Sequence, residues 1–302
     1  MEEIINFYEH IASNKRRTFL TMLFFIVFVG VVAWLIGVWL GYGLSLIPTA
    51  VIFSSVSALG SYFISDKLVL AISGAKEAKK EEYFDLYTVV ENLSIATGMP
   101  HPKVYIIESP AMNAFATGRN PKNAVVAVTT GLLNKLDRSE LEGVVAHELS
   151  HIRDYDILLM SVVAVLVGTI AILADIAQRS LLWGGRGRSD ERRGGNAAVA
   201  IIGLVAVLIS PLIAQLIKLA LSRQREYLAD ATAVKITRYP EGLARALAKI
   251  SGDPNVLETA HSGTAHLFIT NPLKGSRFSS KLASLFSTHP PVEERIRRLQ
   301  AM

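Results

Sequence analysis

Two histidines and a glutamate between positions 147 and 151 have the residue types and spacing of a metal-assisted hydrolytic site. On a helix, His147 and His151 lie on one face, about 6 Å apart along the axis, so both imidazoles can bind one metal ion. Glu148 is rotated by about 100° from His147 and lies beside the ion, where it can take a proton from water. The same short pattern also arises by chance on solvated helix faces, so it needs support from the rest of the chain.

A catalytic zinc ion needs a third protein ligand, and because the chain has no cysteine this ligand must be His, Asp or Glu. Glu226 and Asp230 lie one helical turn apart after a long apolar run, and His151 precedes the apolar run before it. An antiparallel hairpin of the two runs brings Glu226 beside His151. We therefore predict Glu226 as the third ligand, with an ion pair to a nearby cation as the alternative. Asp230 is predicted to accept the second N–H of a ligating histidine, or else to be exposed.

The segment that carries the histidines is predicted to be a helix next to a few short strands. Ser139 is followed three residues later by Glu142, which is a capping-box pattern for the start of this helix. Upstream, β-branched residues predict strands in PKVYIIES and NAVVAVTT, and AMNAFATG between them is a possible third strand at an edge. These elements make up a polar part of the chain, from residue 67 to residue 156, that is continued by residues 218–302.

The composition indicates that another part of the chain lies in lipid. Hydrophobic residues make up 51% of the chain and charged residues 19%, against about 25% charged in ordinary soluble domains. Residues 19–40 and 44–65 are uncharged and long enough to span a bilayer, so residues 1–66 predict a transmembrane hairpin. Lysines and arginines flank both outer ends of this hairpin, which places these ends in the cytoplasm. The net charge of +5 beside apolar runs, with no basic stripe among aromatics, favours lipid and excludes nucleic acid.

A second hydrophobic hairpin is predicted over residues 157–217. Its two apolar runs, 157–174 and 197–217, are joined by a Gly- and Arg-rich loop. If both runs cross the bilayer, the arginines of this loop lie outside, against the positive-inside rule. The alternative is a hairpin that is buried in protein or that enters the bilayer only in part.

Four segments, taken together and in order, carry a resemblance to a known family: NAFATG, HELSHIRDYD, EYLADATA and STHPPVEERI. Over essentially its whole length the chain resembles the membrane-bound zinc metallopeptidases of the M48 family. The resemblance implies an α+β fold, in which a zincin-like metallopeptidase domain is combined with about four hydrophobic membrane helices. It also implies one zinc ion per chain held by His147, His151 and Glu226, with Glu148 as the general base.

Two further segments gain a role only from this resemblance. His289 is implied to lie near the site, where a protonated imidazole would stabilise the oxyanion of the reaction intermediate. The alternative is a turn residue before two prolines. An edge strand that holds an extended substrate is implied for Asn113, Ala114, Phe115 and Ala116, with an ordinary buried strand as the alternative.

The sequence therefore predicts an integral-membrane zinc endopeptidase. The resemblance implies that it cleaves misfolded or damaged membrane proteins without ATP, as part of a stress response such as heat shock. It also implies a multi-pass protein of the bacterial cytoplasmic (inner) membrane whose catalytic domain faces the cytoplasm, with membrane-protein substrates and the lipid bilayer as partners. The alternatives are a prenyl-protein-type peptidase, which would need more membrane spans, and a non-catalytic metal-dependent membrane scaffold. A cation transporter is disfavoured because ionisable residues lie only at the ends of the apolar runs.

Overall fold

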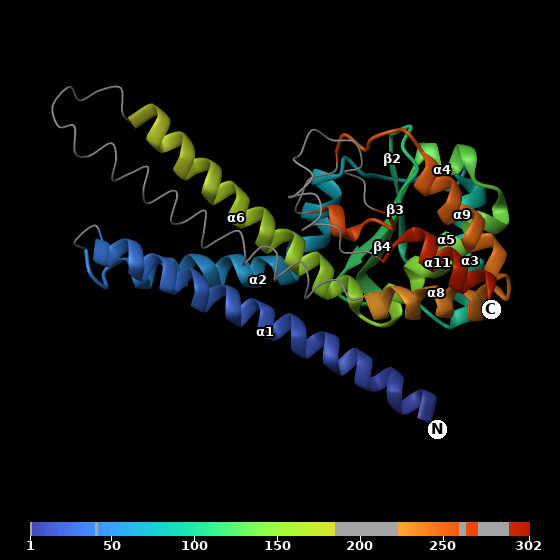
Figure 1. The fold of residues 1–302 in the computed structure, drawn as a ribbon, viewed down its shortest axis with the longest axis horizontal. Helices are drawn as coiled ribbons and strands as arrows, with labels where there is room; N and C mark the ends of the chain where they lie inside the picture. Colours follow the sequence, from blue (N-terminus) through green and yellow to red (C-terminus); the bar gives the residue numbers. More distant parts are fainter. Residues whose placement is uncertain (1, 40–41, 185–222, 260–263, 271–289) are drawn as a thin grey trace.

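The computed structural model describes residues 2–39, 42–184, 223–259, 264–270 and 290–302. Long helices extend from one side of a part that is built from a small sheet and shorter helices (Figure 1). The long helices are α1 (Glu2–Trp39), α2 (Leu46–Ile72) and α6 (Asp156–Gly184). The shorter ones are α3 (Phe84–Thr97), α4 (Thr130–Lys135), α5 (Arg138–Arg153), α8 (Arg223–Thr237), α9 (Pro240–Gly252) and α11 (Val292–Gln300), with 3₁₀ turns η1 (Pro121–Asn123) and η2 (Ala265–Leu267).

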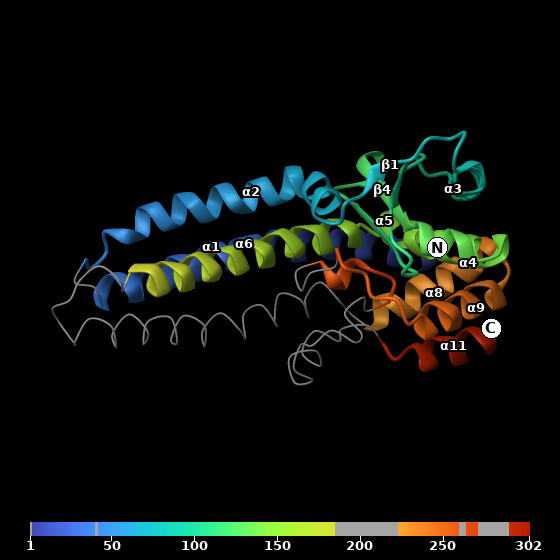
Figure 2. The ribbon, with the colours of Figure 1, turned by 90° about the horizontal axis from the view of Figure 1, so that it is seen from above.

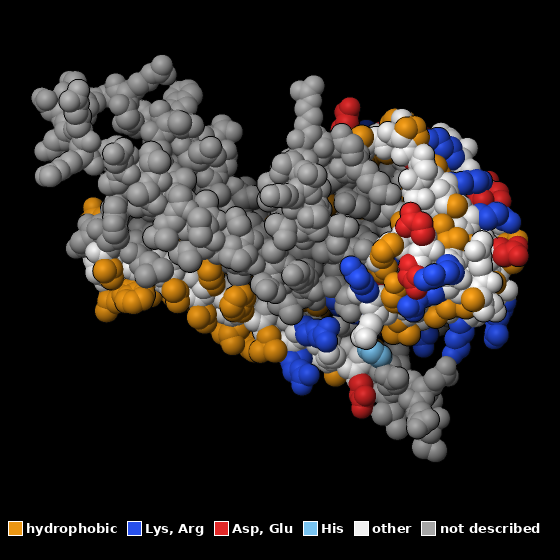
Figure 3. All heavy atoms as spheres, in the orientation of Figure 1, with side chains coloured by type: hydrophobic (Ala, Val, Ile, Leu, Met, Phe, Trp, Pro, Cys, Tyr) orange, Lys and Arg blue, Asp and Glu red, His pale blue; other side chains and the backbone are white. Residues whose placement is uncertain are grey.

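The first two helices form the antiparallel hairpin that the sequence predicts, and α2 continues past the expected end at residue 66 to Ile72. Segments Glu9–Trp34 and Leu46–Ile72 are long and apolar enough to cross a membrane. Their large side chains point outward, as the exposed fractions of 65% for Phe19 and 66% for Ile52 show. Figure 3 shows hydrophobic side chains gathered along the hairpin of α1 and α2, with lysines and arginines beside them. This exposure matches helices whose apolar surface is covered by lipid.

The expectation of about four membrane helices is not met within the described residues, where two candidate spans are seen. The first apolar run of the second predicted hairpin, 157–174, lies in α6. The side chains of α6 are described only as far as Ile170, and the apolar stretch Asp156–Ile170 is shorter than the two candidate spans. Ile157, Leu159 and Leu166 are fully buried there, because α6 packs against α1, α2 and the sheet (Figure 2). The run 197–217 lies outside the described residues.

The predicted strands are present in a four-stranded sheet, counted within the described residues, with the order β1-β2-β4-β3. Strands β2 and β4 are parallel, and β3 pairs antiparallel with β4, with Phe115 opposite Ala127. The predicted third strand, β3, therefore lies at one edge of this sheet. The strands are β1 (Lys76–Glu77), β2 (Lys103–Ile107), β3 (Ala114–Gly118) and β4 (Ala124–Thr129). The fold is thus mostly helical with a small mixed sheet.

Helix α5 lies at the centre of the part that is built from the sheet and the shorter helices, and it packs against β3, α8 and α9. Gly143 permits the contact with α9, because a Cβ at this position would lie 2.7 Å from the backbone nitrogen of Leu243. The start of α5 differs from the expectation. Asp137, rather than Ser139, is the N-cap residue, and its carboxylate and that of Glu140 form the capping box. Asp137 satisfies the free N–H groups of the first turn just as serine would, so the helix begins earlier than predicted.

Candidate metal centre

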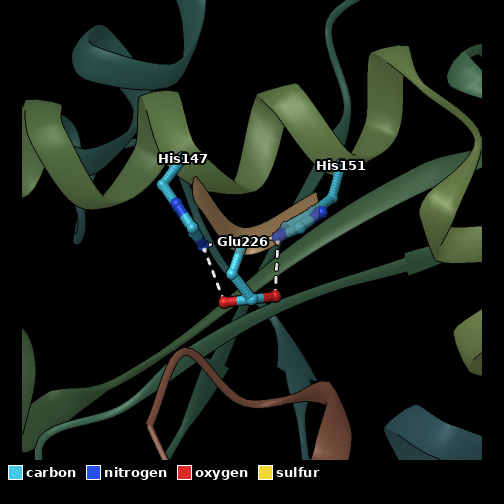
Figure 4. Close-up of side chains that lie close together, drawn as sticks. All are labelled: His147, His151 and Glu226. Atoms are coloured by element: carbon cyan, nitrogen blue, oxygen red, sulfur yellow. Dashed lines mark hydrogen bonds and ion pairs between the residues drawn. The ribbon is translucent and has the colours of Figure 1, made fainter. Parts of the chain in front are cut away.

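Side chains from α5 and α8 meet at one point in the interior (Figure 4). Among the described residues, His147, His151 and Glu226 form a buried group whose ligand atoms all lie within 4.8 Å of one another. The Nε2 atoms of the two histidines are 3.3 Å apart. The Glu226 carboxylate lies 3.8 Å from Nε2 of His147 and 3.5 Å from Nε2 of His151. The structure thus brings together the three residues that the sequence predicts as ligands.

The local sequences explain why the two helices lie so close. One helical turn separates the histidines, so they project from α5 on the same face. On α8, the buried residues next to Glu226 include the small side chains of Ala229 and Ala233, which permit close approach of the backbones. The hydroxyl of Ser150 on α5 lies 3.5 Å from the carbonyl oxygen of Ala229. Small residues on both helices therefore hold the glutamate within reach of the histidines.

The second ring nitrogen of His147 faces Asp230, at a distance of 3.0 Å from Nδ1 to Oδ1. The same carboxylate accepts hydrogen bonds from the fully buried guanidinium of Arg295, at 2.8 Å from Nε and 2.6 Å from Nη2. Burial opposes the charge of Asp230, but Arg295 outweighs this effect and holds the pKa of the carboxyl below its usual value. Burial also lowers the pKa of His147. The imidazole is therefore neutral, as a metal ligand must be.

The second ring nitrogen of His151 faces another carboxylate, that of Asp156, at 3.0 Å from Nδ1 to Oδ2. Burial alone would lower the pKa of His151, but Asp156 and Glu226 outweigh it and raise this pKa to about 9. Both histidines are therefore arranged alike, with Nδ1 toward an orienting carboxylate and Nε2 toward Glu226. Without a metal ion, His151 therefore carries a proton on both ring nitrogens near neutral pH, and binding of a metal ion would release the proton on Nε2. A carboxylate behind each imidazole holds the proton on Nδ1, so that Nε2 is the atom that faces a metal.

Two imidazole nitrogens and one carboxylate oxygen, with no thiolate, form a donor set typical of a catalytic zinc ion. The interatomic distances in the cluster suit one shared ion, because two ligands at about 2.0–2.2 Å from a tetrahedral centre lie about 3.3–3.6 Å from each other. The observed separations of 3.3, 3.5 and 3.8 Å fall close to this range. The residues therefore fit a metal ion, and zinc in particular.

Glu148 is buried next to this cluster but is not one of its three members. Burial raises the pKa of its carboxyl to about 7, and the nearby Glu226 adds to the shift. A hydrogen bond with the backbone of Ala116 acts in the opposite direction and stabilises the carboxylate. Glu148 therefore lies near both the cluster and strand β3, with a pKa suited to taking up and releasing a proton near neutrality.

The NAFATG segment forms β3, for which the sequence left two alternatives, an edge strand and a buried strand. The structure shows features of both, because β3 lies at the edge of the described sheet and is also buried. Part of its outer edge is covered by residues 264–270. Ile269 N–H donates to the carbonyl oxygen of Ala114 at 3.0 Å, and Phe268 forms an antiparallel bridge with Phe115. Asn113 Nδ2 donates to the carbonyl oxygen of Thr270 at 3.2 Å. Leu267, the residue before Phe268, belongs to η2, and η2 also contacts β3. Further along β3 than the bridge at Phe115, the backbone of Ala116 contacts Glu148.

Arg295 and Asp156 are not among the site residues predicted from the sequence, and the predicted residue His289 lies outside the described residues. Arg295 stands in a charged helix, EERIRR, in which nothing distinguishes the buried arginine from its exposed neighbours. Asp156 follows His151 by five positions, a spacing that does not share a face on one helix. The backbone turns between them at Tyr155, whose φ of 61° is left-handed, and this turn brings Asp156 back to the imidazole.

The fold and the site define a metallopeptidase that carries apolar helices suited to a membrane. A family model described as peptidase family M48 matches residues 80–302. The chain is 47% identical over 296 residues to a "Protease HtpX homolog" of Dictyoglomus thermophilum, covering 98% of this chain and 95% of the relative. A "Protease HtpX homolog" of Tropheryma whipplei is also 47% identical over 296 residues, covering 98% of each chain. Among solved structures, S. mikatae Ste24p is similar at 21% identity and a TM-score of 0.48, covering 82% of this chain and 57% of that one. The chain belongs to the M48 peptidase family.

Proposed function

We propose that this chain is an ATP-independent zinc endopeptidase that cleaves misfolded or damaged membrane proteins next to the bilayer surface. The observation that carries the proposal is the buried cluster of His147, His151 and Glu226, with Glu148 beside it. His151 lies near the end of α5, directly before α6, and Glu226 lies near the start of α8. The cluster therefore lies where α6 leaves the peptidase part, which comprises the sheet and the shorter helices. The membrane is thus one neighbour of the site, and stress that damages membrane proteins would supply its substrates.

Zinc held by the three ligands would polarise the scissile carbonyl group and make a bound water more acidic. Glu148 takes the proton of the attacking water and then delivers it to the leaving amine, which a carboxyl with a pKa of about 7 can do in both directions. Asp230 and Asp156 keep the imidazoles in the orientation that presents Nε2. Arg295 keeps Asp230 ionised and in place.

The substrate is proposed to bind as an extended strand along β3, from Ala116 onward. This part of the strand is next to Glu148, whereas Ala114, two residues earlier, already accepts a hydrogen bond from Ile269. Addition of a strand supplies main-chain hydrogen bonds that do not depend on the substrate sequence. Such binding suits a peptidase that acts on unfolded segments of many proteins.

The peptidase part is proposed to face the cytoplasm. Lys15, Arg16 and Arg17 are exposed on α1, directly before the exposed apolar stretch that begins at Phe19. Asn14, next to them, contacts the peptidase part. The basic residues and the active site therefore lie on the same side of the membrane, and positively charged flanks mark the cytoplasmic side. We also propose that the hairpin of residues 157–217 enters the bilayer, since α6 packs against α1 and α2 and extends from the same side of the peptidase part as they do (Figures 1 and 2).

The function is tested with the purified chain in detergent micelles, zinc-loaded or treated with a chelator. A denatured membrane protein, its folded form and a prenylated C-terminal peptide serve as substrates. The proposal expects zinc-dependent cleavage of the denatured protein without ATP. Preference for the prenylated peptide would support a prenyl-protein-type peptidase, and metal binding without any cleavage would support a scaffold. The orientation is tested in cells with an impermeant maleimide, which should label a cysteine at Tyr42 but not one at the exposed Asn134.

A further inference from the structure

The first membrane helix contacts the outer shell of the metal centre through one buried side chain, Asn14. Only 4% of Asn14 is exposed. Its Nδ2 group donates one hydrogen bond to the carbonyl oxygen of Asp154 and another to Oδ1 of Asp156, each at 2.8 Å. Both acceptors lie at the corner where α5 ends and α6 begins, directly after the ligand His151.

Asp156 connects this contact to both ligand-bearing helices. Its Oδ2 atom is 3.0 Å from Nδ1 of His151 on α5. Its Oδ1 atom lies 3.1 Å from the guanidinium of Arg225, the residue that precedes the ligand Glu226 on α8. One carboxylate thus joins Asn14, a metal-ligating histidine and the neighbour of the third ligand.

The corner itself has a backbone conformation that needs support. Tyr155 lies in the left-handed region with φ of 61°, which is disfavoured for a residue with a large side chain. Helix α1 supports this residue as well, because Nζ of Lys15 lies 4.3 Å from the centre of the Tyr155 ring. Adjacent residues of α1 therefore hold the corner on which the position of Asp156 depends.

We propose that Asn14 is a positioning residue of the metal centre, which holds Asp156 in place and through it orients His151 for the metal. The first membrane helix is then part of the peptidase machinery in addition to being an anchor. This contact comes from outside residues 80–302, the part that the family model covers. The inference rests on the metal site proposed above.

The test is the zinc affinity of the full-length chain in detergent, measured by competition with a chromophoric chelator. Asn14→Leu keeps a similar volume but removes both donated hydrogen bonds, together with the long one that Oδ1 of Asn14 accepts from Arg225 at 3.4 Å. Thr18→Val is the matched control, because Thr18 is also buried on α1 but, among the described residues, its hydroxyl bonds only to the carbonyl oxygen of Asn14 in the same helix. We expect zinc affinity to fall about five-fold for Asn14→Leu, as for loss of one net hydrogen bond, and to stay unchanged for Thr18→Val.

The route through Asp156 is tested with a double-mutant cycle. Asp156→Ala should weaken zinc binding on the order of 10–100-fold, and Asn14→Leu should then cause no further loss. The absorption spectrum of the cobalt-substituted chain should change for Asn14→Leu and not for Thr18→Val. If Asn14→Leu does not yield folded chain, Asn14→Ala takes its place with the same expected results.

Unchanged zinc affinity in the Asn14 variant would overturn the proposal. An equal loss in the Asp156→Ala background, or an equal loss in Thr18→Val, would overturn it too, because Asn14 would then act on overall folding instead of on Asp156. Failure of the metal site itself gives a different result, which is an unmodified chain that binds no zinc.

Discussion

The buried pair of Asp230 and Arg295 allows stability and metal binding to be separated by substitution. Arg295 is fully buried, with the Asp230 carboxylate at 2.6 Å and the Glu226 carboxylate at 3.5 Å. Breaking a buried ion pair by removing one partner costs about 3–5 kcal/mol, because the other charge stays uncompensated. Since Glu226 remains near Arg295, we expect the lower value, about 3 kcal/mol, for Asp230→Asn. For a domain of this size that is a fall of roughly 6–12 °C in melting temperature.

Asp230→Asn removes the charge but keeps Oδ1, which can still accept from Nδ1–H of His147. Zinc affinity should therefore fall less than the loss, on the order of 10–100-fold, expected for Asp230→Ala. Arg295→Met combined with Asp230→Asn removes both charges, so the double variant should recover stability to within about 1 kcal/mol of the unmodified chain.

Melting is followed at a fixed scan rate in the presence of a chelator, so that altered zinc affinity does not contribute to the transition. Zinc affinity is measured separately by competition. If Asp230→Asn melts at the same temperature as the unmodified chain, or if the double variant is no more stable than Asp230→Asn alone, the pair does not have the energetic role that its burial implies.

Three further results are expected. Glu226→Ala should lower zinc affinity as severely as His147→Ala, measured by metal analysis after dialysis, and unchanged metal content would exclude Glu226 as a ligand. Ala116→Pro should abolish cleavage while zinc stays bound, because proline removes the backbone N–H beside Glu148. Ala116→Gly keeps this N–H and should stay active. Equal activity of the two variants would contradict substrate binding along β3. Glu148 must be ionised to act as a base, so kcat/KM should rise with pH to a plateau. The midpoint should lie below the pKa of about 7 that Glu148 has without a metal, because a zinc ion nearby favours the carboxylate. Activity that falls as pH rises through this range would contradict a basic role for Glu148.

Local patterns in the sequence predicted much of the fold and the ligand cluster. The spacing of His147 and His151 and the strand pattern of NAFATG depend only on residues near one another, and the structure shows both elements. The hairpin of apolar helices also follows from a local property, the length of an uncharged run. Glu226 was predictable because it stands one turn before Asp230, immediately after an apolar run.

The remaining features depend on tertiary contacts that no local pattern encodes. Asn14 and Asp156 are far apart in sequence, and Arg295 stands among exposed charged residues of similar type. The start of α6 is apolar enough to suggest a membrane span, but its side chains are buried by α1, α2 and the sheet. Hydrophobicity shows that a side chain avoids water, but it does not show whether protein or lipid covers it.

The central claim is that Glu148 acts as the base of a zinc site formed by His147, His151 and Glu226. Its most direct test compares the purified full-length chain with the Glu148→Gln variant for bound zinc and for cleavage of a denatured membrane protein. We expect one zinc ion per chain in both proteins, and cleavage by the unmodified chain alone. Cleavage by Glu148→Gln at the rate of the unmodified chain would contradict the account, and so would loss of zinc from a variant that is still folded.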